Sequence, residues 1–168
     1  MSMEFDFTGV NESGFVLVKP GRYLVEVDQW YKRTKEETGN DVFDVDVKFI
    51  GGAYDGQTAR YFTGVTEKSI GFVLALFSAL GLVNDSDRGE QGQLLARAVQ
   101  GEKDSMGRTE ITHIEVNGEK RAVKGRKAIA VVTNEPNNSG ELTTRITRLE
   151  KPTEDSKQEQ GTAQKKLW

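Results

Sequence analysis

Cysteine is absent from this chain of 168 residues, and histidine occurs only once, at His113. Without cysteine there is no disulfide framework, no thiolate metal site and no thiol nucleophile. His113 lies in a predicted hairpin strand, so we expect neither a histidine-based triad nor a histidine-rich zinc site. Phosphate-binding glycine loops are missing too, although the chain has 18 glycines. We therefore expect no cofactor, no metal and no catalytic residue.

Long apolar segments are also lacking. The longest, residues 70–83, has 14 residues and is too short to span a bilayer. The opening segment MSMEFDFTG has no basic region followed by an apolar stretch, as a secretory signal would have. These absences, together with the lack of cysteine, predict a cytoplasmic protein with no membrane contact.

Three segments alternate apolar and polar residues with a period of two, which is typical of strands with one buried face. They are residues 22–33, 41–50 and 57–63, and short turn-rich segments connect them. Consecutive strands with short connections predict an antiparallel meander with one dry face and one wet face.

Apolar residues then recur at helical spacing from Ile70 to Leu80, between an N-terminal cap at Thr66 and a stop at Gly81. Residues 84–124 are predicted to be an irregular insertion with a short helix at 93–100, followed by a hairpin of residues 109–116 and 119–123 around a two-residue turn at Asn117-Gly118. Two more strands are predicted at 125–133 and 141–150.

This order of elements predicts a mainly β protein. Three strands, a helix and then further strands are typical of the OB-fold, a partly open antiparallel barrel with a helix between strands three and four. We expect one such domain over residues 1–151. The polar, unpatterned tail, residues 152–168, is expected to be disordered.

The segment DVFDVDVKF, residues 41–49, has two interpretations. Alternation on a half-exposed strand requires polar outer residues, so we interpret Asp44, Asp46 and Lys48 as a solvated face. The alternative is a Mg²⁺-dependent nuclease, in which Asp28 or Asp44 joins Asp46 and Lys48 on one sheet.

Aromatic and cationic residues adjoin each other elsewhere. Single-stranded nucleic acid is bound by bases that stack on aromatic rings while cations follow the backbone. Trp30 is the strongest aromatic candidate, because alternation places it on the polar face with Lys32. The full set of candidate nucleic-acid-binding residues is Trp30, Lys32, Arg33, Arg60, Phe62, Lys120, Arg121, Lys124, Arg126 and Lys127.

Several short motifs together resemble a bacteriophage family that was long catalogued as a domain of unknown function and is now associated with single-stranded DNA-binding proteins. The motifs are F-D-F-x-G-V at Phe5–Val10, a P-x-G-x-Y strand start that is shortened here to Pro20–Tyr23, G-x-Y-x-G at Gly52–Gly56 followed by Phe62, a helix of the F-x-x-x-L-x-A-L-G type matched loosely by Phe72–Gly81, and a G-R/K-x-hydrophobic strand at Gly125–Ile129.

The resemblance covers roughly residues 5–151 and implies an OB-like fold without catalysis. It also implies binding of single-stranded DNA with little sequence preference, in replication or recombination in the host cytoplasm. Residues 84–124 are longer than the usual connection in this family. Leu167 and Trp168 in the tail are candidates for contacting replication or recombination proteins. A phage adaptor that binds a host protein and no nucleic acid is a further alternative.

Overall fold

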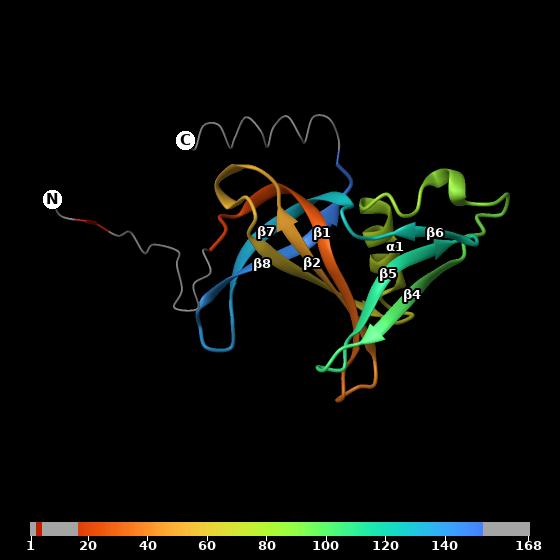
Figure 1. Cartoon of the computed structure of the whole chain (residues 1–168), viewed down its shortest axis with the longest axis horizontal. Coiled ribbons are helices and arrows are strands. Elements are labelled where there is room, and N and C mark those ends of the chain that lie inside the picture. The colour runs from red at the N-terminus through yellow and green to blue at the C-terminus, as the bar shows by residue number, and fades with distance from the viewer. Residues whose placement is uncertain (1–2, 5–16, 153–168) are drawn as a thin grey trace.

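The computed structural model describes residues 3–4 and 17–152, whose strands form one antiparallel sheet around a single α-helix (Figure 1). In chain order the elements are β1 (Gly21–Thr34), β2 (Asp41–Phe49), η1 (Gly52–Tyr54), β3 (Thr58–Val65), α1 (Ile70–Ala79), η2 (Asp85–Asp87), β4 (Ala96–Lys103), β5 (Thr109–Val116), β6 (Glu119–Ala122), β7 (Lys127–Pro136) and β8 (Leu142–Glu150). The predicted mainly β class is confirmed, as is the helix after the third strand. The N-terminal motif, the tail from residue 153, Leu167 and Trp168 all lie outside the described residues.

The long strand β1 organises the sheet. One edge of β1 pairs with β2, and the other edge pairs first with β7 and then, at Tyr31 and Lys32, with β5. β3 and β8 lie next to each other, and α1 contacts both. No ladder joins these two strands within the described residues, so the sheet is OB-like in order but is not closed into a barrel.

A β-bulge in β1 overturns the prediction for Trp30. Val27 lies opposite Val47 and Gln29 lies opposite Asp46, so Asp28 is an extra residue in the ladder. An extra residue reverses the in–out alternation beyond it. Trp30 therefore points into the core, where it is fully buried, and cannot stack on a base.

The core beneath the sheet is aromatic at its centre. The ring of Trp30 lies 5.3 Å from that of Phe43 and 6.0 Å from that of Phe77, which α1 supplies. The helix ends at Ala79, close to the predicted stop at Gly81, whose positive φ of 69° suits glycine and lets the chain turn sharply. Within the described residues, no helix combines the length and apolar character needed to cross a membrane.

The insertion is more regular than predicted, although the hairpin predicted at residues 109–123 is confirmed by β5 and β6. Residues 93–100, predicted as a short helix, instead lead into β4, which pairs with β5; β5 also pairs with β6. Figure 1 shows these strands together beside α1. β4 forms a hairpin with the next strand, β5, and this cross-strand pairing, which local helical spacing does not register, fixes its extended conformation. The predicted turn is confirmed, with positive φ at Asn117 (50°) and Gly118 (87°).

Two arginines attach the insertion to the end of the helix. Arg121 binds both carboxylate oxygens of Asp87 at 2.7 and 2.8 Å and also donates to the Leu82 carbonyl. Arg126 donates to the carbonyls of Gly81 and Ala122. Both were predicted to bind nucleic acid. In the structure they instead bind backbone carbonyls, among them those of Gly81 and Leu82 in the segment directly after α1.

The Asp87 carboxylate makes this attachment sensitive to acid. Hydrogen bonds from Arg121, and next from the Asn84 backbone, lower the pKa of Asp87 from 3.8 to about 2. A group whose pKa is lower in the folded state stabilises the fold above its unfolded pKa, and this contribution is lost as the pH falls through the folded value. Asp87→Asn should therefore lower the thermal unfolding midpoint most at pH 7, with a difference that shrinks from pH 4 towards pH 2. A difference that is constant across this range would contradict the assignment.

Candidate nucleic-acid interface

The outer face of β1, β2 and β3 carries polar and aromatic side chains in cross-strand rows. In one row Tyr31, Asp44 and Phe62 lie opposite one another. In the next row Gln29, Asp46 and Arg60 lie opposite one another. Side chains that are paired across antiparallel strands lie on one face and contact each other. We call this surface the aromatic–arginine face; its members are Tyr31, Arg33, Arg60, Phe62 and Arg108.

A buried carboxylate holds Arg33 against Phe62. Nε of Arg33 lies 2.7 Å from Oδ2 of Asp44, whose side chain is only 1% exposed. The Arg33 guanidinium carbon lies 5.8 Å from the centre of the Phe62 ring, within cation–π range. Phe62 itself is 53% exposed. The result is an accessible aromatic ring beside an arginine whose position is fixed.

The second carboxylate of the β2 strand pairs with β3. Arg60 binds Asp46 through two hydrogen bonds, of 2.6 and 3.2 Å. The hydrogen bond that Arg60 donates to Asp46 is the main cause of the raised pKa of Arg60. Asp44 and Asp46 thus each face an arginine. Asp46 and Lys48 are partly exposed, as the interpretation of a solvated strand face predicts, whereas Asp44 is buried beneath Arg33, contrary to it. In the part of the chain that the structure describes, no group of three or more His, Cys, Asp or Glu residues is arranged to hold a metal.

Tyr31 and Arg108 were not predicted to belong to this face. The bulge that turns Trp30 inward turns Tyr31 outward, where the Arg108 guanidinium lies 4.1 Å from its ring centre. Arg108 is held in turn by Asp104, at 2.9 Å. Alternation alone placed Tyr31 in the core, and only the pairing of β1 with β5 brings Arg108 near it.

The other predicted cations do not gather at one place. Lys32 lies on the opposite face of β1, with its amine 3.9 Å from Asp41. Lys127 lies opposite Glu26 on β1 and extends the outer face onto β7. Lys120 and Lys124 are exposed, and no ion pair involving them or Lys127 occurs between described residues. Of the ten predicted residues, the structure unites Arg33, Arg60 and Phe62 on one surface.

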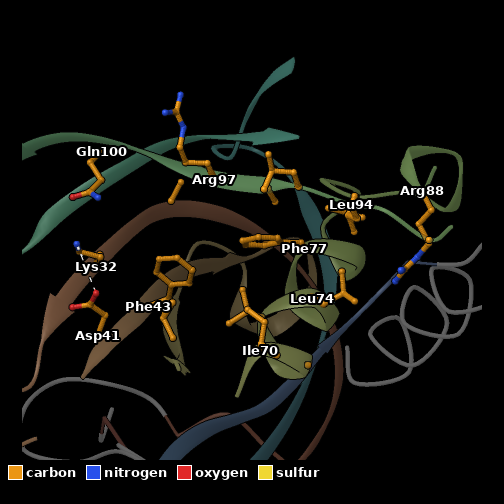
Figure 2. A pocket seen from close by; sticks show the side chains of 18 residues that line it. Lys32, Asp41, Phe43, Ile70, Leu74, Phe77, Arg88, Leu94, Arg97 and Gln100 are labelled. Carbon is orange, nitrogen blue, oxygen red and sulfur yellow. Dashed lines mark ion pairs between the residues drawn. The ribbon is translucent and has the colours of Figure 1, made fainter. Parts of the chain in front are cut away.

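A separate apolar groove of about 620 Å³ lies between α1 and β4 (Figure 2). Phe43 and Phe77 form its floor, and the Lys32–Asp41 ion pair lies at one end (Figure 2). Ile70 on its wall is 61% exposed, and Leu95 is 75% exposed. This volume lies within the range of ligand pockets in proteins.

Comparison with known families gives one result. A family model described as protein of unknown function (DUF669) matches residues 4–99, which include β1, β2, β3, α1 and the beginning of β4. No curated protein matches the sequence. The aromatic residues and two of the arginines on the outer face lie inside the matched region, whereas Arg108 and the exposed lysines of β6 and β7 lie beyond it.

Proposed function

The chain belongs to the DUF669 family of proteins of unknown function, and we propose that it is a non-enzymatic protein that binds single-stranded DNA with little sequence preference. On this proposal it is of bacteriophage type and acts in replication or recombination in the host cytoplasm. Bases would stack on the aromatic–arginine face. The family resemblance described above and the OB-like order of elements both support this function.

One observation carries the proposal, namely the exposure of Phe62 beside a fixed arginine. A phenyl ring that is 53% exposed on a strand adds little to the core. Arg33 is already held by Asp44 at 2.7 Å, so it loses little conformational freedom when a base stacks nearby. Stacking on an aromatic side chain contributes about 1–3 kcal/mol per base, whichever base it is.

The charges of the face limit the contribution of phosphate contacts. Arg33, Arg60 and Arg108 each pair with a carboxylate, so the phosphate contacts proposed here come mainly from lysines outside the aromatic–arginine face, namely Lys120, Lys124 and Lys127. Three neutralised phosphates on a single strand correspond to a log–log salt slope of about −2. This protein is therefore proposed to rely more on stacking than on charge.

The test is a fluorescence-anisotropy titration of labelled oligo-dT of about 30 nucleotides against a duplex of the same length, with Mg²⁺ present. We expect preferential binding to the single strand, and Phe62→Ala and Phe62→Leu should each weaken it by about 5- to 150-fold. Phe62→Tyr should retain affinity because it keeps an aromatic ring. Leu95→Ala, which removes an exposed apolar side chain in the groove, is the matched control and should bind like the wild type.

Probe integrity after the titration separates this proposal from the nuclease alternative. An intact probe supports binding without chemistry. A shortened probe, with cleavage that disappears in Asp46→Ala, would instead make the β2 carboxylates metal ligands.

The groove between α1 and β4 favours a second candidate function, that of an adaptor for a host protein. Exposed apolar side chains that line a concavity are typical of surfaces that bind proteins. Intact folding with no DNA affinity, even at low salt, would favour this candidate.

A further inference from the structure

A second, smaller hollow opens where β3 and β8 lie side by side without pairing. Its volume is about 270 Å³, and its walls come from β3, β8 and the beginning of α1. Phe62 lines one part of it and Phe72 another, and Arg145 and Thr147 contribute from β8. The hollow therefore adjoins the aromatic–arginine face, because Phe62 belongs to both.

The side chain of Phe72 contributes little to the core of the protein. It lies in the first turn of α1 and is 65% exposed, whereas Val73, Leu76 and Phe77 of the same helix are buried. Two exposed phenyl rings from different elements thus border one concavity. Exposed aromatic rings at a concave site are typical of surfaces that stack bases.

A glycine in the lining of the hollow lets the turn before α1 pack closely against β3. Gly64 follows Phe62 by two residues, so it lies on the same face of β3. A Cβ atom at this position would come within 3.3 Å of the Ser69 hydroxyl oxygen. That hydroxyl is fixed, since it donates to the Gly64 carbonyl at 2.6 Å and accepts from the Thr66 backbone at 3.0 Å. The turn before α1 therefore packs closely on a β3 position that has no side chain.

Arg145 places a positive charge in the lining of the hollow. Arg145 pairs with Glu135 at 2.9 Å, but both side chains are largely exposed. Exposed ion pairs of this kind contribute little to stability, so Arg145 can exchange its partner at small cost. A phosphate beside a bound base is a suitable replacement, because a guanidinium binds phosphate oxygens through two parallel hydrogen bonds.

We propose that this hollow holds one base of single-stranded DNA between the rings of Phe62 and Phe72, with Arg145 on the neighbouring phosphate. The inference rests on the proposed function and extends it, since it assigns a base site that includes Phe72 and Arg145. The strand then passes from the aromatic–arginine face into the gap between β3 and β8.

The experiment measures the affinity of full-length variants for the same labelled oligo-dT. Phe72→Ala should weaken binding by about 5- to 50-fold. Ile70→Ala is the matched control, because Ile70 is equally apolar, similarly exposed at 61% and on the same helix, but lines the other groove. It should bind within about twofold of the wild type, as expected for a residue without a stacking role. Both side chains are exposed, so both variants should fold, which thermal unfolding checks.

The double variant tests whether the two rings hold the same base. If they do, Phe62→Ala with Phe72→Ala should lose less affinity than the product of the two single losses, because either change already releases the base. A loss equal to that product would overturn the shared site. Phe72→Ala that binds like the wild type while Phe62→Ala is weakened would also overturn it and leave the proposed function standing. Wild-type protein that binds no single strand would overturn the proposed function itself.

Discussion

Replacement of Trp30 by alanine is expected to lower the free energy of unfolding by about 3–5 kcal/mol, the usual cost of truncating a buried tryptophan. Trp30 is fully buried and contacts the rings of Phe43 and Phe77, so its loss opens a cavity between the sheet and α1. Urea unfolding followed by circular dichroism measures the change without relying on the fluorescence of the removed residue.

Trp30→Phe separates a role in stability from a role in binding. The indole nitrogen Nε1 is buried and has no hydrogen-bond partner within the described residues, so phenylalanine removes an unpaired polar group while it keeps most of the ring. It should cost less than Trp30→Ala, because the phenyl ring leaves a smaller cavity than the alanine methyl group does. The folded variant should bind oligo-dT like the wild type. A stable Trp30→Phe protein with weakened DNA binding would show that Trp30 contacts the ligand after all.

Arg33→Met is expected to destabilise the protein by about 3 kcal/mol, at the lower end of the range for breaking a buried ion pair. The Asp44 side chain is 1% exposed, and its Oδ1 atom already lacks a hydrogen-bond partner in the described structure. The substitution also removes the arginine that pairs with Oδ2, so a buried carboxylate is left without its counter-charge. The lower end of the range applies because Arg60 remains near enough to interact with Asp44. Chemical unfolding of the purified variant gives the value.

Two further variants identify the cause. Arg97→Met breaks the exposed pair between Arg97 and Glu115 and should cost less than about 1 kcal/mol. The double variant Arg33→Met with Asp44→Asn removes the charge that Arg33 neutralises, so it should recover most of the lost stability. If the double variant is no more stable than Arg33→Met, the loss comes from packing of the arginine side chain and not from the uncompensated carboxylate.

Local pattern was a good guide wherever one face of an element meets the core directly. The alternation in β2 correctly predicts buried Phe43 and Val45 with Asp46 on the outer face. Helical spacing and Gly81 correctly predict α1 and its end. These features follow from the period of each element and from the preference of glycine for positive φ, which are properties of the sequence itself.

The candidate site was only partly predictable. Arg33, Arg60 and Phe62 lie on the outer face. One extra residue in β1 reverses the alternation, so Trp30 is buried and Tyr31 lies on the outer face, the opposite of what alternation predicts. Arg121 and Arg126 bind carbonyls in the segment directly after α1, and Phe72 reaches a hollow that β8 completes. Each of these outcomes depends on a partner strand or helix far away along the chain.

The sequence by itself determined the mainly β class, the position of the helix, the hairpin turn at Asn117-Gly118 and the polar outer face of β2, because periodicity and backbone preference act over a few neighbouring residues. Only the tertiary structure decided which aromatic rings are exposed, which arginines are already paired and where the sheet stays open. Those properties depend on strand register and on contacts between distant segments, and a shift of one residue in register changes the face of every side chain beyond it.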